Sequence, residues 1–203
     1  MTILITKLII VLIFSYLIGS IPTGYIIVKL LKGIDIRQTG SGSTGATNVK
    51  RILGTKWFFI VMFLDALKGA IPVLIAIHWF NFMNYMGLAH VIAAISVIIG
   101  HSKSIFLGFT GGKSVATGVG TILALCWPVG LIIAAIWGLI TYTSKYVSLG
   151  SIIAISLAPI LMNAFEQNIY YICFAALGAI YVILMHKSNI KRLLEGRENK
   201  VRK

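Results

Sequence analysis

Three short polar segments of the 203-residue chain carry residue types suited to binding phosphate. The first runs from Gly40 to Arg51 and reads G-S-G-S-T-G-A-T-N-V-K-R. Closely spaced glycines let a backbone turn its N–H groups toward one point, and hydroxyls with a guanidinium can complete an anion site. The segment lacks the Gly-Lys-Ser/Thr of a nucleotide-binding loop, and no strand is expected before it, so it is not a Rossmann turn. A flexible connection is the alternative interpretation.

The second segment, Gly111-Gly112-Lys113-Ser114, leads directly into an apolar stretch. Glycines followed by a lysine at the beginning of a helix combine unpaired N–H groups, the helix dipole and a positive charge, which together favour an anion. The alternative is an ordinary lysine of a cytoplasmic loop, where lysine and arginine are enriched.

The third segment follows the last apolar stretch and contains His186, Asn189 and Arg192 at a spacing of three residues. If the helix continues past the membrane, these side chains share one face at its surface. Basic tails after a final span are common because lipid headgroups attract them, and that is the alternative interpretation.

Membrane helices must hold these segments in place. The chain is 58% hydrophobic and only 11% charged, against the roughly 25% of charged residues in an ordinary soluble domain. Apolar stretches return between short polar connections, which predicts a single all-α membrane bundle over residues 1–203. The formal net charge of +13 does not indicate nucleic-acid binding, because the basic residues lie in those connections.

The predicted spans number seven if one long apolar stretch is divided. That stretch, 114–142, is too long for one helix, and Trp127-Pro128 near its middle predicts a division into two short helices. The other spans are expected at about 5–31, 56–79, 86–101, 149–164 and 169–186.

The distribution of basic residues favours seven spans over six. Lysine and arginine number six in 29–56, two in 101–113, one in 143–149 and seven in 187–203, while the turns near 80–85, 128–130 and 163–168 have none. Seven spans place every basic connection on one side, as the positive-inside rule requires. The N-terminus is then outside, and the C-terminus and all three polar segments face the cytoplasm.

Several residues inside the predicted spans are expected to be structural. Asp65 and Lys68 have the i,i+3 spacing of a pair that neutralises itself within the bundle, and a functional pair is the alternative. Kinks are predicted at Pro22, Pro72 and Pro159. No metal site is predicted from His78, His90 and His101, and no disulfide from Cys126 and Cys173.

The blocks G-S-G-x-x-G-A-T-N-x-x-R, G-G-K-x-V-A-T and H-x-x-N-I-x-R-L-L-x-G-x-E occur in this order over nearly the whole chain. They resemble the bacterial acyl-phosphate-dependent glycerol-3-phosphate acyltransferase family. The resemblance implies a seven-helix protein of the bacterial cytoplasmic membrane with its active site facing the cytoplasm. It further implies transfer of a fatty acyl group from acyl-phosphate to the 1-position hydroxyl of glycerol 3-phosphate, giving lysophosphatidate and phosphate without a cofactor. We expect the enzyme to act as a monomer.

Site residues follow from the motifs and the resemblance together. The catalytic residues are expected to be Lys113, His186 and Asn189, and the substrate-binding residues Ser41, Gly42, Thr47, Asn48, Arg51, Gly112, Ser148, Ser151 and Arg192. The resemblance suggests that a serine at 148 or 151 lines the site, and a helix-capping serine is the alternative. No Ser-His-Asp triad is apparent on the cytoplasmic face, so a covalent acyl-enzyme is not expected.

Three short stretches depart from the family pattern. The family usually has Asn-Pro where Ser43-Thr44 stand and glycine where Ser114 stands, and Lys103-Ser104 occupy a stretch that is more often aromatic or proline-bearing. A transporter of phosphate or an organophosphate is the alternative function. Such a protein often has two related halves with broken helices, whereas this chain has no evident repeat and its polar motifs lie on one predicted side.

Overall fold

The computed structural model describes residues 2–80, 86–166 and 168–201, and the regular secondary structure of these residues is helical apart from one bridge between Ser104 and Thr110. The all-α prediction is confirmed. The predicted outer turn near 80–85 falls almost entirely outside the described residues, as does residue 167 of the turn near 163–168. The chain packs as two compact units, Met1–Ala124 and Leu125–Lys203.

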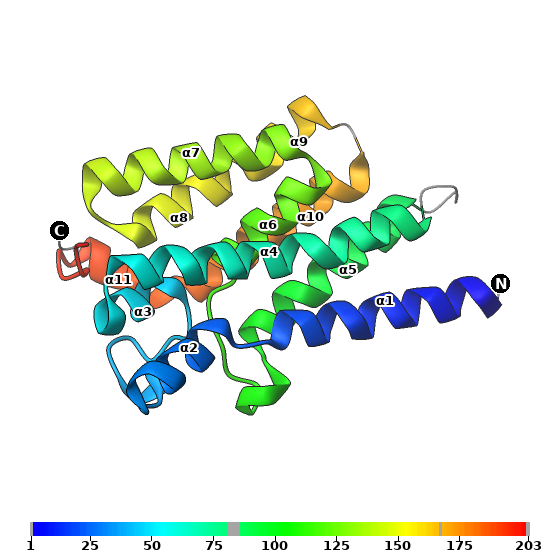
Figure 1. The fold of residues 1–203 in the computed structure, drawn as a ribbon. Helices are drawn as coiled ribbons and strands as arrows, with labels where there is room; N and C mark the ends of the chain where they lie inside the picture. The colour runs from blue at the N-terminus through cyan, green and yellow to red at the C-terminus, as the bar shows by residue number, and fades with distance from the viewer. Residues whose placement is uncertain (1, 81–85, 167, 202–203) are drawn as a thin grey trace. The chain divides into compact units, whose positions relative to one another are not determined.

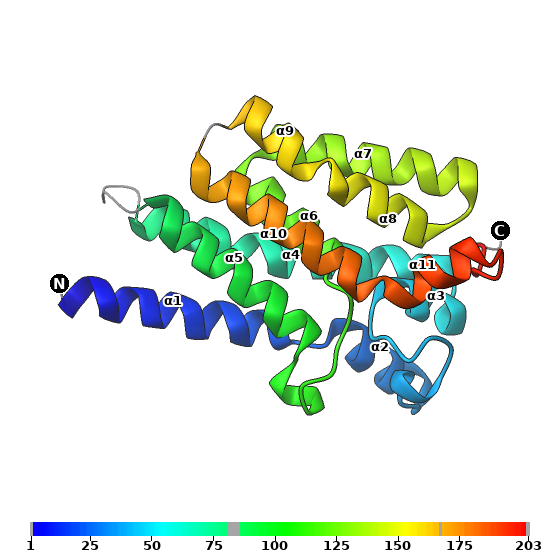
Figure 2. The same ribbon diagram turned by 180° about the vertical axis from the view of Figure 1, so that it is seen from behind.

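The N-terminal unit is built on α5, which packs against both α1 and α4, while α3 packs against α4 (Figure 1). Figure 2 shows α1 alongside α5 from the opposite side. The elements of this unit are α1 (Thr2–Ser20), α2 (Thr23–Lys32), η1 (Ile36–Gln38), α3 (Ala46–Leu53), α4 (Thr55–Phe80), α5 (Met86–Ser102), η2 (Ile105–Leu107) and α6 (Val115–Leu125).

Glycines let the helices of this unit approach closely. A Cβ atom on Gly19 of α1 would lie 2.2 Å from the carbonyl oxygen of Val97 in α5, and one on Gly120 of α6 would lie 1.9 Å from that of Ala66 in α4. Real side chains cannot occupy these positions. Small residues at crossings are typical of membrane helices, whose association depends on close van der Waals packing.

The first apolar segment is broken at Ile21-Pro22, between α1 and α2. The break exposes backbone carbonyls that a membrane interior cannot hydrate. Oγ of Ser104 donates to the carbonyl of Ser20 at 2.6 Å, and Nζ of Lys68 donates to that of Ile21 at 2.7 Å. Hydroxyl and ammonium groups thereby replace the missing helical partners.

The buried pair Asp65–Lys68 belongs to this break. Its Nζ–Oδ1 distance is 2.9 Å, and the side chains are only 2% and 7% exposed. The Thr23 hydroxyl, on the first residue of α2, donates to Asp65. Since each charge is paired and also bonded to the break, the geometry supports the structural interpretation.

The C-terminal unit places α8 and α9 between α7 and α10, with α11 against α8 and α10. Its elements are α7 (Trp127–Ser144), α8 (Val147–Ser156), α9 (Ala158–Phe165), α10 (Ile169–Met185) and α11 (Lys187–Leu194). The last residues return to the loop between α7 and α8, where the Val201 N–H donates to the Lys145 carbonyl at 2.8 Å.

Proline has different effects at its four positions. The 114–142 stretch is divided at Cys126, and Pro128 lies in the first turn of α7, so the predicted division is confirmed. Pro22 and Pro159 also lie at helix boundaries, whereas Pro72 lies inside α4 without interrupting it. An α-helix tolerates proline in its first turn, because the N–H group that proline lacks would have no helical partner there.

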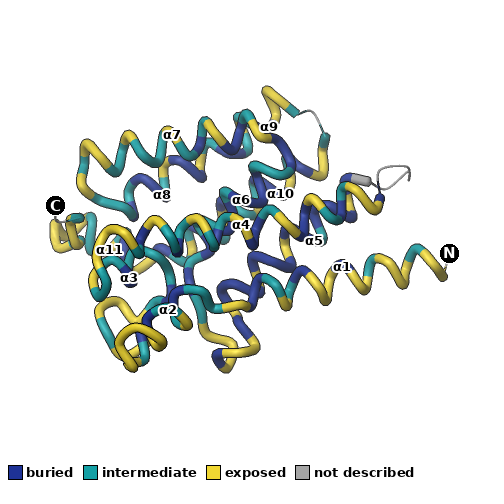
Figure 3. The backbone as a smooth tube through the Cα atoms, in the orientation of Figure 1, coloured by how far each residue is buried: buried dark blue, intermediate teal, exposed yellow. Residues whose placement is uncertain are grey.

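Four helical segments of the described residues are long and apolar enough to cross a membrane: Thr2–Lys32, Thr55–Phe80, Trp127–Ser144 and Val147–Phe165. Helices α10 and α11 form a fifth candidate bent by 61°, and Gly87–Ser102 and Val115–Leu125 are shorter apolar helices. Exposed residues run along α1 and α7 (Figure 3). Many of them carry large apolar side chains, as expected of helices that face lipid. The count of seven spans and the orientation of the ends remain predictions.

Candidate active site

The first motif folds around the side-chain amide of Asn48. Its Nδ2 group donates to the carbonyls of Ile36, Thr39 and Ser43 at 3.2, 3.0 and 2.9 Å, and its Oδ1 accepts from the Ser41 N–H at 3.0 Å. The side chain is buried. Asn48, predicted to bind substrate, is therefore engaged in shaping the loop in this structure.

Two glycines make this turn possible. Gly40 and Gly42 have φ angles of 60° and 70°, in the left-handed region that favours glycine. A Cβ atom on Gly40 would lie 2.2 Å from Oδ1 of Asn48, so a larger residue would displace the amide. Of the three glycines in the first motif, Gly40 and Gly42 are therefore required by the geometry of the turn.

The same loop leads into α3, which presents the other predicted phosphate ligands. Gly45 precedes the helix, and Thr47 and Arg51 are one turn apart on it, so they share a face. Ser41 and Arg51 are exposed and Thr47 is half-buried. The three polar groups form no side-chain hydrogen bond or ion pair with another described residue. They are available to an anion.

The second motif closes on the end of α5. The Gly112 N–H donates to the His101 carbonyl at 3.1 Å, and a Cβ atom on Gly112 would lie 2.1 Å from Nε2 of that histidine. Lys113 is half-buried and stands two residues before α6. Buried His101 therefore packs against the second motif and fixes the position of Gly112. The Nδ1 atom of His101 lies 3.6 Å from Oδ1 of Asp65.

Ser114 has a φ angle of 58°, in the left-handed region that favours glycine, the residue that the family pattern has at this position. Its hydroxyl donates to the Ile98 carbonyl at 3.0 Å. This hydrogen bond offsets part of the conformational cost, which is of the order of 1 kcal/mol for a non-glycine residue. The departure from the family pattern keeps the turn.

Arg37 connects the loops that carry the first two motifs. Its guanidinium forms an ion pair with Asp35 at 2.6 Å, donates to the Leu107 carbonyl at 3.3 Å and lies 5.5 Å from the centre of the Tyr25 ring. The side-chain hydrogen bond from Arg37 holds the pKa of Asp35 below its usual range. The pair therefore remains charged near neutral pH.

In the C-terminal unit, three predicted site residues converge on Glu198. Ser148 Oγ and Asn189 Nδ2 donate to Oε1 of this carboxylate at 2.9 and 2.7 Å, and Arg192 Nε donates to Oε2 at 2.7 Å. Burial alone would raise the pKa of Glu198, but the hydrogen bonds from Asn189, Arg192 and Ser148 hold it below its usual range. The C-terminal tail is thereby attached to α8 and α11.

Sequence reasoning assigned no role to Glu198. The residue ends the third motif, H-x-x-N-I-x-R-L-L-x-G-x-E, and an acidic residue in so basic a tail was the signal available. The contact between Glu198 and Ser148 could not be predicted, because the two residues are 50 positions apart in the sequence.

His186 lies at the junction of α10 and α11 and is buried. Its Nδ1 atom is 2.8 Å from the Val182 carbonyl, which can only accept, so Nδ1 carries the proton in the neutral ring and Nε2 presents the lone pair. Ser151, one turn after Ser148, instead donates to the Val147 carbonyl of its own helix at 2.9 Å. It does not join the cluster around Glu198.

Comparisons with known proteins agree on one family. Residues 9–196 match the family model described as glycerol-3-phosphate acyltransferase. The glycerol-3-phosphate acyltransferase of Trichormus variabilis is 48% identical over 94% of this chain and 90% of its own, and that of Prochlorococcus marinus is 46% identical over 95% and 97%.

Solved structures give the same answer. The glycerol 3-phosphate form of PlsY (YgiH), an integral membrane glycerol 3-phosphate acyltransferase, superimposes with a TM-score of 0.90 at 39% identity, covering 97% of this chain and 96% of that one. Its lysophosphatidic acid form has a TM-score of 0.88 at 38% identity. The chain therefore belongs to the glycerol-3-phosphate acyltransferase family and is an integral membrane acyltransferase.

Proposed function

We propose that this acyltransferase takes its acyl group from an acyl-phosphate and transfers it to the 1-position hydroxyl of glycerol 3-phosphate. The products are 1-acyl-glycerol 3-phosphate (lysophosphatidate) and inorganic phosphate. The observation that carries the proposal is the pair of glycine-shaped loops beside Arg51 and Lys113, because a reaction between two phosphate-bearing substrates needs more than one anion site.

The predicted residues have distinct roles in this proposal. Ser41, Thr47, Arg51 and Lys113 bind phosphate oxygens, with Asn48 and the glycines at 42 and 112 holding the loops in shape. His186, Asn189 and Arg192 orient glycerol 3-phosphate, and Ser148 supports Asn189 through their common partner Glu198. Ser151, whose hydroxyl is bonded within its own helix, lines the proposed substrate site next to Ser148.

The chemistry is direct acyl transfer. The 1-hydroxyl oxygen of glycerol 3-phosphate attacks the acyl carbonyl carbon, and the bond from that carbon to the phosphate oxygen breaks with its electron pair leaving on phosphate. The hydroxyl proton passes to a phosphate oxygen. A covalent acyl-enzyme is not favoured, because Nδ1 of His186 faces a backbone carbonyl where a triad histidine would face a carboxylate. Positioning and charge stabilisation supply most of the acceleration.

The same proposal includes the setting of the enzyme. The chain crosses the bacterial cytoplasmic membrane seven times as a monomer and one functional domain, with its N-terminus outside and its C-terminus in the cytoplasm. The positive-inside distribution of 16 of the 18 basic residues supports this orientation.

The test is a donor comparison with purified protein in lipid. We expect palmitoyl-phosphate and glycerol 3-phosphate together to yield lysophosphatidate and one phosphate for each acyl group transferred, with no product from palmitoyl-CoA. Phosphate release that does not depend on glycerol 3-phosphate would contradict acyl transfer. If lysophosphatidate forms from glycerol 3-phosphate and palmitoyl-CoA but not from palmitoyl-phosphate, the assignment of the donor is wrong, although the family activity is kept.

A further inference from the structure

Helix α11 has two faces with different chemistry. Asn189 and Arg192 project on one side and hold the tail through Glu198. His186 lies at the junction just before the helix. The opposite side consists of residues at positions i, i+3, i+4 and i+7, which we call the outer face of α11: Lys187, Ile190, Lys191 and Leu194.

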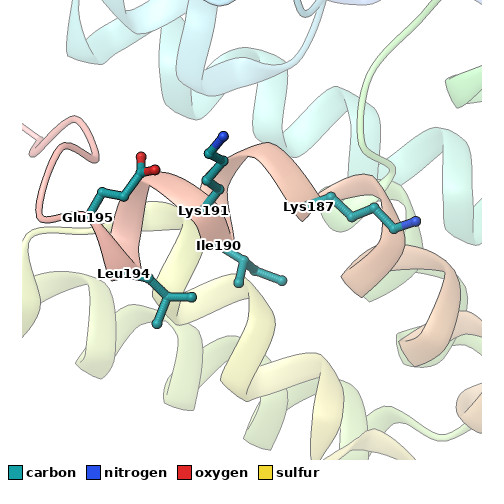
Figure 4. Close-up of a pocket in the computed structure, with 5 residues that line it drawn as sticks. All are labelled: Lys187, Ile190, Lys191, Leu194 and Glu195. Atoms are coloured by element: carbon teal, nitrogen blue, oxygen red, sulfur yellow. The ribbon is translucent and has the colours of Figure 1, made fainter.

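The outer face forms a shallow surface pocket together with Glu195 (Figure 4). In this view the side chains of Ile190 and Leu194 lie along one edge of the outer face, and the Lys191 side chain lies along its other edge. Leu194 is 85% exposed, and both lysines are exposed. The Glu195 carboxylate pairs with Arg197, and neither Lys187 nor Lys191 forms an ion pair with another described residue. The face therefore joins uncompensated positive charge to exposed apolar surface.

The direction of α11 suits a membrane surface. The helix follows the apolar α10 directly and is inclined to it by 61°. A short helix that turns away from a membrane-crossing segment and carries lysines beside an exposed leucine and a half-buried isoleucine has the properties of an interfacial helix. Such a helix binds with its apolar side chains at the acyl-chain boundary and its ammonium groups near the headgroups.

We propose that the outer face of α11 docks on the anionic phospholipids of the enzyme's own membrane. Lys187 and Lys191 contact headgroup phosphates, while Ile190 and Leu194 enter the boundary with the acyl chains. Charge complementarity and the integral membrane setting of the family select bilayer phospholipid as the occupant. Docking of this face holds the opposite face, with Asn189 and Arg192, in a fixed orientation, so turnover depends on anionic lipid. This last step rests on the proposed function.

The binding test uses the full chain in nanodiscs of phosphatidylcholine, alone or mixed with phosphatidylglycerol. Cys126 and Cys173 are replaced by alanine, and a spin label is attached at Leu194→Cys or, for comparison, at Ser188→Cys. We expect the label at 194 to become more accessible to oxygen and less accessible to a water-soluble nickel complex when phosphatidylglycerol is present, whereas the label at 188 remains accessible to water.

Charge variants give the matched control. Replacing both lysines by glutamine should abolish the response of the 194 label, and replacing both by arginine should preserve it. Each lysine is expected to contribute about fivefold to the affinity for anionic headgroups, and high salt should weaken the response. The proposal would be overturned if the label at 194 were equally accessible to water in both bilayers. It would also be overturned if the label in the double glutamine variant responded to phosphatidylglycerol as it does with both lysines present. These readings need no turnover, so they are independent of the proposed reaction.

The functional consequence is measured with palmitoyl-phosphate as donor. Wild-type turnover should rise with phosphatidylglycerol, and the glutamine pair should retain the turnover seen in phosphatidylcholine but lose that rise. If the glutamine pair instead raises KM for palmitoyl-phosphate equally in both bilayers, the face binds the acyl donor and docking on the bilayer is refuted.

Discussion

At the scale of single residues, the predicted site contains two kinds of side chain. Asn48, Asn189 and Ser148 are engaged in hydrogen bonds that shape the protein, whereas Ser41, Thr47 and Arg51 leave their polar groups open to a ligand. Both kinds are polar residues, so the sequence alone does not separate them. Substitution of the first kind should affect folding as well as catalysis, and substitution of the second kind should affect catalysis alone.

Arg51 provides a test of the second kind. Replacing it by glutamine should raise KM for a phosphate-bearing substrate by about 10- to 100-fold, because a charge-assisted hydrogen bond is lost. The melting temperature should not change, since the guanidinium is exposed and has no partner among the described residues. Steady-state kinetics and thermal unfolding in detergent measure both effects. Lys56→Gln removes another exposed charge nearby and should leave KM unaltered.

Glu198 predicts a pH dependence of the C-terminal tail. Because the pKa of Glu198 is lowered from the ordinary value of 4.5, the folded tail favours the carboxylate. Its stabilisation is fully present above that value and is lost as the pH falls through the lowered pKa. Hydrogen exchange over residues 186–201, corrected for the intrinsic rate, should accelerate on acidification below about pH 4.5. In Glu198→Gln the exchange should be fast already at pH 7 and should change little with acid.

At the scale of elements, breaks and close crossings position the motifs. The first apolar segment would be a continuous span without Pro22, and its break is held by Ser104 and by the Asp65–Lys68 pair. The second motif rests on His101 at the end of α5, which lies beside the same pair. The buried cluster of Asp65, Lys68 and His101 in the N-terminal unit therefore supports the loop that carries the second motif.

The Asp65–Lys68 pair should be more sensitive to single than to double replacement. Asp65→Asn or Lys68→Met leaves one buried charge without its partner, at a cost of about 3–5 kcal/mol. The double variant leaves no charge buried, so its loss should be smaller than the sum of the two. Thermal unfolding of the four proteins in detergent gives the coupling energy. Additive losses would show that the two charges do not depend on each other.

Helix α6 has one glycine, Gly120, packed against α4 and another, Gly118, with open space around it. Gly120→Ala should destabilise the protein by about 1–3 kcal/mol and reduce turnover, because the new Cβ would lie 1.9 Å from the Ala66 carbonyl oxygen. Gly118→Ala meets nothing within 4 Å and should be tolerated. Melting temperatures and activities of the two variants compare the same substitution on the same helix. Equal effects would show that the crossing is not tightly packed.

At the scale of the whole molecule, the charge pattern predicts that the two ends lie on opposite sides of the membrane. In a chain with Cys126 and Cys173 replaced by alanine, an impermeant maleimide added to spheroplasts should label Thr2→Cys but not Lys200→Cys. Lysis should expose the second position. Labelling of both before lysis would indicate an even number of spans and would contradict the seven-span prediction.

The sequence by itself determined the helical membrane class, the division at Trp127-Pro128 and the three polar motifs. These features depend on composition, local backbone preference and the order of residues along the chain, which need no knowledge of distant contacts. The same holds for the family, because its motifs are short and contiguous.

Only the tertiary structure decided what each polar side chain contacts. Glu198 meets Ser148 from the far end of its unit, Lys68 reaches the carbonyl of Ile21, and Asn48 turns inward to the loop that precedes it. Each of these contacts satisfies a buried charge, carbonyl or amide that water cannot reach. The partner is chosen by the packing of elements distant in the chain, so residue types and spacing do not reveal it.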